Sequence, residues 1–225
     1  MAQKLWEKNV QVDQEVDTFT VGKDREMDLY LAKYDVLGSM AHITMLESIG
    51  LLTKEELTIL LAELKNIYAV ADCGRFVIEE GVEDVHSQVE LMLTRSLGDT
   101  GKKIHSGRSR NDQVATDMHL YLKAKLVEVI EKLDNLRGTL VNLADKHTYT
   151  IMPGYTHLQH AQPISFGHHL MAYYNMFTRD AERFEFNIKH TDISPLGAAA
   201  LAGTTFPIDR NMTSDLMGFA KPYSN

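Results

Sequence analysis

Apolar residues recur at alternating spacings of four and three between Leu122 and Leu143, and this pattern is the strongest constraint on the fold of the chain. Such spacing places the side chains along one stripe of an α-helix, with Lys, Glu and Asp between them. A second stripe of the same kind runs from Leu170 to Ile188. The stripes predict helices of ~35 and ~25 residues, which at 1.5 Å per residue would reach roughly 50 Å and 40 Å. Helices of this length favour a bundle over a compact globule.

Further apolar residues lie beside the first stripe, at Val127, Ile130, Val141 and Ala144. They widen the apolar face, so that more than one neighbouring helix is needed to cover it. The chain cannot supply all of these neighbours itself. We therefore expect it to form an oligomer.

The N-terminal half predicts shorter helices. Thr53 and Glu56 match a capping box at the start of one helix. Residues 84–97 predict another, with Gly98 as its stop, and Leu31 to Ser48 predicts a third. We see no alternating strand pattern. The sequence therefore predicts a mainly α protein, with an N-terminal helical domain over residues 1–106 and the start of a long-helix bundle domain over residues 107–225.

The composition excludes several classes of function. The chain has 31 acidic and 23 basic residues, a formal charge of −8, which argues against a nucleic-acid partner. It has no apolar run of the ~18 residues that span a bilayer, and no apolar segment typical of a signal peptide near Met1. Cys73 is the only cysteine, which favours a reducing compartment. We expect a soluble cytoplasmic protein without a membrane partner.

Three polar segments interrupt the helical pattern, and the first is residues 83–90. Asp84 can be a simple N-cap, with His86 a partly exposed residue of the first turn. Because a helix N-terminus also favours anions, the same residues can bind a carboxylate. Spacing alone favours the first interpretation and leaves the second open.

The second segment, residues 101–112, concentrates positive charge in an acidic chain. It does not match a phosphate-binding P-loop, because Ser96 stands where Gly is needed and a helix precedes the loop. A small polycarboxylate therefore fits better than a nucleotide, since Arg binds carboxylates through a planar fork. The alternative is an ordinary solvated loop. The basic residues are Lys102, Lys103, His105, Arg108 and Arg110.

The third segment, residues 152–163, lies between the two long helices. Pro153 and Gly154 predict a turn, and Pro163 suits the first position of the second long helix. His157 and His160 have a spacing that could ligate a metal, but no HExxH pattern or further ligand supports a metal site. A general acid or base is the better interpretation of a histidine here.

Taken together, these segments resemble the argininosuccinate lyase family. Residues 107–117 read Gly-Arg-Ser-Arg-Asn-Asp-Gln-Val-Ala-Thr-Asp, and residues 154–163 read Gly-Tyr-Thr-His-Leu-Gln-His-Ala-Gln-Pro. Segments 35–41, 83–86 and 194–203 match the same family in order. The resemblance extends from Leu5 to Asn225. It implies a central bundle of long helices in a homotetramer, whose active sites each take segments from different subunits.

The resemblance also implies a reaction and a set of site residues. The family eliminates fumarate from argininosuccinate to leave arginine, with no metal or organic cofactor. His157 would be the acid/base histidine. The substrate-binding residues would be Arg110 and Asn111 at the substrate carboxylates, Thr156 at the succinyl part, and Asp84, His86, Ser87 and Asp28 in the same pocket.

Two departures from the family pattern stand out. Asp24 stands where the family often has Ser. The loop that carries the family's catalytic serine would lie beyond Asn225, so we expect this chain to be an N-terminal part without activity of its own. Two alternatives remain open: another lyase of the superfamily, such as adenylosuccinate lyase, and a non-catalytic helical protein like the crystallins related to this family.

Overall fold

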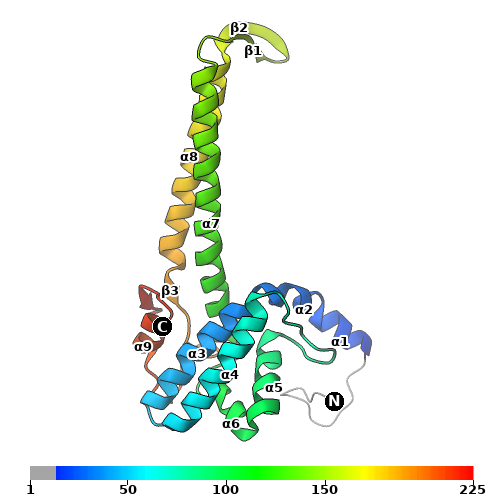
Figure 1. The fold of residues 1–225 in the computed structure, drawn as a ribbon, viewed down its shortest axis with the longest axis vertical. Coiled ribbons are helices and arrows are strands. Elements are labelled where there is room, and N and C mark those ends of the chain that lie inside the picture. The colour runs from blue at the N-terminus through cyan, green and yellow to red at the C-terminus, as the bar shows by residue number, and fades with distance from the viewer. Residues whose placement is uncertain (1–13, 225) are drawn as a thin grey trace. The chain divides into compact units, whose positions relative to one another are not determined.

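The computed structural model describes residues 14–224, without the side chains of Gln14 and Asp17. The two ends of the resemblance, at Leu5 and Asn225, and the segment after Met1 lie outside these residues. The backbone divides into two compact units (Figure 1): one contains the chain up to Tyr121 together with Asp192–Asn225, and the other is Leu122–Thr191. The predicted division into residues 1–106 and 107–225 stays a prediction.

The first unit is built from short helices, as the sequence predicts. Its core lies among α3 (Ala32–Ser48), α4 (Lys54–Asp72) and α5 (Val85–Leu97). Ile43, Leu64 and Leu93 are fully buried there. The remaining elements of the unit are α1 (Gln14–Val21), α2 (Asp24–Met27), η1 (Asp28–Tyr30), α6 (Asp99–Lys102), η2 (Lys103–His105), α9 (Arg210–Leu216) and the short parallel strands β3 (Ile193–Ser194) and β4 (Lys221–Pro222).

The predicted helix ends of this unit are confirmed. Thr53 and Glu56 form both hydrogen bonds of the capping box at the start of α4. Asp84 is the N-cap of α5 and accepts the backbone N–H of Ser87. Gly98, with φ of 61°, ends α5 in the left-handed region that glycine adopts without steric cost. The cap by Asp84 sets where α5 begins, which matters for the site.

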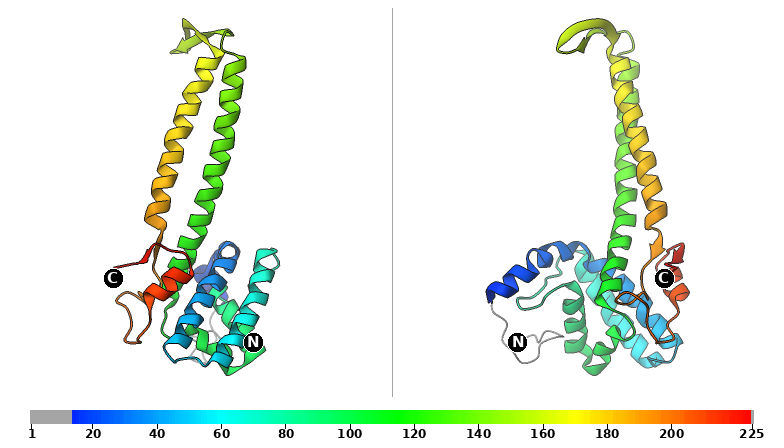
Figure 2. Two further views of the ribbon diagram at one scale, coloured as in Figure 1. Left: turned by 60° about the vertical axis from the view of Figure 1, so that its left-hand side comes forward. Right: turned by 180° about the vertical axis from the view of Figure 1, so that it is seen from behind.

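The second unit contains the predicted pair of long helices. Helix α7 (Arg110–Lys146) has 37 residues, the first of which belong to the first unit, and α8 (Phe166–Thr191) has 26. Within this unit the two helices run side by side (Figure 2). Arg137 donates to Thr178 Oγ1 across the pair. A Cβ on Gly167 would lie 2.6 Å from the carbonyl oxygen of Ala144, so the close approach requires glycine. The mainly α fold is confirmed.

The connection between the long helices differs from the prediction. Residues Ile151–Thr156 (β1) and Gln159–Ser165 (β2) form an antiparallel hairpin. Pro153 lies opposite Pro163 inside the strands, so the first does not make the turn and the second does not begin α8. Both strands of a two-stranded ribbon are edges, where proline is tolerated because its missing N–H can face solvent. The chain reverses at His157 and Leu158 instead.

Apolar side chains of both long helices stay exposed, on the first stripe and beside the second. Leu136 is 40% exposed on α7, and Met176 and Phe186 on α8 are 48% and 61% exposed. Ala181 and Leu170 are buried. No helix among residues 14–224 combines the length and apolarity needed to cross a membrane.

Candidate active site

Arg110 is the centre of the first group of predicted site residues. It lies in the first turn of α7, and its guanidinium reaches the N-terminus of α5. Its Nε is 3.0 Å from Asp84 Oδ2, and its Nη2 donates to Ser87 Oγ at 3.1 Å. Its Nη1 lies 3.2 Å from Glu83 Oε2. The structure therefore brings Asp84, Ser87 and Arg110 together, with two carboxylates already sharing the guanidinium.

Asp28 belongs to the same group through the backbone. Its Oδ2 accepts the N–H of Val85, the first residue of α5, at 3.1 Å. Burial raises the pKa of the Asp28 carboxyl, although the hydrogen bond from Val85 opposes the shift. Asp28 and Asp84 thus both bind free N–H groups at the start of α5, where the helix dipole favours negative charge.

His86 lies in the first turn of α5 and is almost fully buried. Its Nδ1 is 2.6 Å from Asp35 Oδ1, on α3, and 3.7 Å from Asp117 Oδ2, on α7. This burial differs from the partly exposed position that the simpler interpretation of residues 83–90 assigned to it. Gln113 Nε2 donates to the same Asp35 oxygen at 2.5 Å.

Asp35 and Asp117 are both completely buried, but the pKa values of their carboxyls shift in opposite directions. Burial opposes ionisation of Asp35, but the charges of His86 and Arg108 and two hydrogen bonds outweigh it, so the pKa of Asp35 lies below its usual value. Burial and the neighbouring charge of Asp35 raise the pKa of Asp117 well above its usual value. The surroundings therefore favour the charged form of Asp35 and the neutral form of Asp117.

The basic residues of segment 101–112 do not form one anion-binding surface. Lys102 pairs with Asp99, and Lys103 pairs with Glu56 at 2.5 Å. Arg108 is buried and donates to Ser39 Oγ at 3.1 Å. The solvated-loop interpretation fits Lys102, whereas Arg108 is a buried charge whose pKa burial lowers.

Asn111 is exposed beside Arg110, and its amide Nδ2 donates to the carbonyl oxygen of Ala200 at 3.2 Å. The next residue, Asp112, is buried and accepts the N–H groups of Gly197 and Ala199, both at 2.8 Å. The loop after β3, which was part of the family resemblance, is thereby attached to the start of α7 next to Asn111.

Thr156 and His157 lie in the second unit, at the end of the β1–β2 hairpin. Both are exposed. His157 has φ of 48° and Leu158 has φ of 60°, the pairing that a two-residue type I′ turn requires. For residues other than glycine this backbone is uncommon and strained, and such strain occurs often at functional sites.

Thr156 also lines an open groove of about 590 Å³ against the start of α8. His168 and His169 of α8 also line it. His160 is 2.9 Å from the Tyr155 hydroxyl and faces a neighbouring hollow. The polar residues predicted between the long helices, within residues 152–163, therefore lie on the hairpin.

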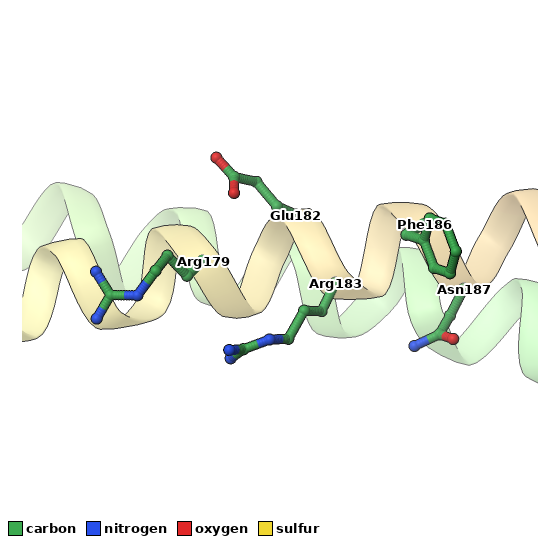
Figure 3. Close-up of a pocket in the computed structure, with 5 residues that line it drawn as sticks. All are labelled: Arg179, Glu182, Arg183, Phe186 and Asn187. Carbon is green, nitrogen blue, oxygen red and sulfur yellow. The ribbon is translucent and has the colours of Figure 1, made fainter.

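A further hollow lies on α8 and contains none of the predicted site residues. It is lined by Arg179, Glu182, Arg183, Phe186 and Asn187, which all come from one helix (Figure 3). Arg183 forms an ion pair with Asp180 of the same helix. A shallow surface made by a single helix offers no converging polar groups, so we do not count it as a site.

The structure thus assembles six of the predicted residues in the first unit and two in the second. Sequence reasoning missed Asp35 and Asp117 as partners of His86. It also missed Asp112, although the spacing from Ser109 to Asp112 resembles a capping box and Asp112 does accept the N–H of Ser109. The predicted site residues in the first unit are Asp28, Asp84, His86, Ser87, Arg110 and Asn111, and those in the second are Thr156 and His157.

Comparisons with known proteins show that the chain is similar to argininosuccinate lyases. The chain is 64% identical over 222 residues to argininosuccinate lyase of Streptococcus thermophilus. The match covers 99% of this chain and 48% of the relative. It is 64% identical over 219 residues to argininosuccinate lyase of Parabacteroides distasonis, covering 97% and 49%. The chain spans about half the length of these curated relatives. The resemblance to argininosuccinate lyase is confirmed.

Two solved structures share the fold. An EDDS lyase variant with bound fumarate matches with a TM-score of 0.77 and 31% identity, covering 97% of this chain and 43% of that one. A fumarate lyase:delta crystallin from Brucella melitensis matches with a TM-score of 0.72 over 93% and 52% of the two chains, and at 17% identity it shows the fold alone. The family model described as lyase matches residues 7–221, and the chain therefore belongs to the lyase family.

Proposed function

We propose that this chain provides part of an argininosuccinate lyase, which eliminates fumarate from argininosuccinate and leaves arginine. The observation that carries the proposal is the 64% identity to argininosuccinate lyases over 99% of the chain. The matched region includes the start of α5, the start of α7 and the hairpin, because it covers 99% of the chain. In an organism that makes arginine, the reaction would serve arginine biosynthesis.

The reaction requires a proton to leave the carbon next to a carboxylate. The resulting carbanion is stabilised as an aci-carboxylate, and the guanidinium nitrogen then departs with its bonding electrons. Donors must therefore face the developing negative charge, and an acid and a base must be in reach. None of these steps requires a metal or an organic cofactor.

We assign His157 as the acid/base histidine and Thr156 as a donor to the succinyl part of the substrate. The exposed hairpin position supports this assignment, because it leaves the imidazole accessible. Arg110 and Asn111 would hold substrate carboxylates at the start of α7, where free N–H groups add to the attraction for anions. Binding at Arg110 requires the substrate to join or displace Glu83, which now shares the guanidinium.

Asp84, His86, Ser87 and Asp28 would shape the same pocket. Asp84 and Ser87 hold the Arg110 guanidinium through two separate atoms, which fixes the direction of its fork. Asp28 and Asp84 bind N–H groups at the start of α5 and thus keep that turn in place. These four residues would orient the groups that contact the substrate.

We further propose that the functional protein is a homotetramer in the cytoplasm, with domains at residues 1–106 and 107–225. The exposed apolar side chains of α7 and α8, such as Leu136 and Phe186, support an oligomer because burying them removes apolar surface from water. Each active site would combine segments from different subunits, with the hairpin residues meeting those near Arg110. The acidic composition argues against nucleic-acid partners.

The proposal is tested with the complete product of the gene that encodes this chain. Fumarate release is measured with argininosuccinate and, in parallel, with adenylosuccinate. We expect fumarate and arginine in equal amounts from the first substrate only. Fumarate from adenylosuccinate alone would assign the protein to the other succinyl lyase, and no fumarate from either would favour a non-catalytic, crystallin-like protein.

A further inference from the structure

A buried group of three ionisable side chains lies at the first turn of α5, and two of them, Asp35 and Asp117, have no role in the reaction as proposed. Asp35 on α3, His86 on α5 and Asp117 on α7 each place one nitrogen or oxygen atom within 4.8 Å of those of the other two. Asp35 and Asp117 have no exposed surface, and His86 is 7% exposed. Burying ionisable groups is costly unless they are paired, so the arrangement calls for an explanation.

The two carboxyls of this group differ in the hydrogen bonds they receive. Asp35 Oδ1 accepts from His86 Nδ1 at 2.6 Å and from Gln113 Nε2 at 2.5 Å. The same His86 nitrogen is 3.7 Å from Asp117 Oδ2, too far for a hydrogen bond. Within residues 14–224, neither oxygen of Asp117 has a hydrogen-bond donor. The two donors that converge on Asp35 favour a charged carboxylate there. Within this part of the chain, Asp117 receives no hydrogen-bond donor, which favours a neutral acid.

The bond to Asp35 determines which nitrogen of His86 carries a hydrogen. A ring nitrogen that faces a carboxylate at 2.6 Å must donate, so Nδ1 is protonated whether the imidazole is neutral or charged. Nε2 is left without a hydrogen-bond partner among the residues that the structure describes. Since His86 lies between Asp84 and Ser87, both bound by Arg110, this nitrogen belongs to the same turn as the proposed carboxylate site.

We propose that Asp35 is a positioning residue that fixes the tautomer and ring orientation of His86, so that Nε2 is the nitrogen available to the substrate. Asp117 has no such role and acts as a neutral neighbour. The kinetic part of this proposal rests on the lyase function proposed above. Its structural part, the tautomer of His86, does not.

The kinetic test uses the complete gene product and the substitution Asp35→Asn, which keeps the shape of the side chain and removes its charge. We expect kcat/KM with argininosuccinate to fall about ten- to hundredfold, the range seen for outer partners that orient metal-bound histidines. Asp117→Asn is the matched control in the same buried group. Because an amide resembles a neutral acid, we expect it to change kcat/KM by less than about threefold. Equal losses in both variants would overturn the proposal.

A double-mutant cycle separates positioning from a general structural effect. If Asp35 acts through His86, then Asp35→Asn has no further effect on kcat/KM once His86→Gln is present. If Asp35 only supports the fold, its effect multiplies with that of His86→Gln and is accompanied by a lower melting temperature in both backgrounds. Multiplicative losses would therefore contradict the proposal.

The structural test needs no activity. Histidine labelled with ¹⁵N in the wild-type protein, with His86→Gln to assign the signal, reports which ring nitrogen carries the hydrogen. We expect His86 to have its hydrogen on Nδ1, or on both nitrogens, and never on Nε2 alone, the form that neutral imidazole prefers in water. A neutral ring with a bare Nδ1 would refute the proposal. If the wild type releases no fumarate while this tautomer is present, the lyase function fails and the positioning by Asp35 stands.

Discussion

The carboxylate of Asp112 accepts the backbone N–H of Ala199 at 2.8 Å, joining residues 87 positions apart. The same oxygen, Oδ2, accepts the N–H of Gly197 at 2.8 Å, and Asp112 is 3% exposed. Ala199 has φ of 55°, a left-handed conformation that costs free energy for alanine unless neighbouring contacts hold it. The loop that reaches Asn111 is therefore kept in one conformation by a buried charge at the start of α7.

Replacing Asp112 should destabilise the protein. Asp112→Asn removes the charge and leaves one carbonyl oxygen for three N–H groups, so at least one buried donor loses its partner. We expect the free energy of unfolding to fall by about 1–3 kcal/mol, measured in urea. Asp209→Asn is the control, because Asp209 also accepts two N–H groups but is exposed, and its loss should be smaller. A larger loss at Asp209 would contradict the account.

His42 should make stability depend on pH. It is buried and donates from Nε2 to the carbonyl oxygen of Ser106 at 2.8 Å. Burial and the charge of Arg108 lower the pKa of His42 to about 3. Below the ordinary histidine pKa of about 6.5 the unfolded chain binds a proton that the folded chain does not, so stability falls as pH falls, by about 1.4 kcal/mol per unit.

The measurement compares the wild type with His42→Gln, whose amide nitrogen can still donate to Ser106. Between pH 7 and pH 5 we expect the free energy of unfolding to fall more steeply in the wild type, with a difference of about 2 kcal/mol at pH 5. His168→Gln, at an exposed histidine, is the control and should keep the wild-type slope. If the free energy of unfolding depends on pH equally in the wild type and in His42→Gln, then His42 binds protons equally in the folded and unfolded chains, and the prediction is wrong.

Arg110 should not tolerate lysine. The guanidinium contacts Glu83, Asp84 and Ser87 through three different nitrogens, and a single ammonium cannot keep all three contacts. In the complete gene product, Arg110→Lys should lower kcat/KM for argininosuccinate by about tenfold or more, equivalent to about 1.4 kcal/mol. Arg183→Lys on the exposed face of α8 is the matched control. An unchanged kcat/KM would indicate that Arg110 forms ordinary surface ion pairs and does not bind the substrate.

The helices were predictable because their signals are local. The capping box at Thr53 and Glu56, the N-cap Asp84 and the stop at Gly98 each act within one turn, and the stripe from Leu122 to Leu143 repeats over many turns. The hairpin was missed because its turn residues, His157 and Leu158, lack the Asn-Gly or Asp-Gly pattern that marks such turns. Its two prolines also argued against strands.

The residues of the candidate site stay a prediction, and their contacts could not be predicted from the sequence. Motif resemblance selected His86 and Arg110, but nothing local indicates that His86 pairs with Asp35, 51 residues earlier. Likewise, no sequence pattern connects Asp112 with Ala199. Such pairings depend on how α3, α5 and α7 pack in the first unit, which is decided by the apolar core around Leu64 and Leu93 and not by the polar residues themselves.

The turnover of His157→Asn tests the central claim most directly. Asn keeps the size and polarity of the exposed turn residue but cannot exchange a proton near neutral pH, so binding should persist while the chemical step slows. We measure kcat and KM for fumarate release by the complete gene product, with His160→Asn as the control three residues away. We predict that kcat falls about 10²–10⁴-fold in His157→Asn with KM changed little, and that the control stays near the wild type. A wild-type kcat in His157→Asn would contradict the assignment of this hairpin as the catalytic element.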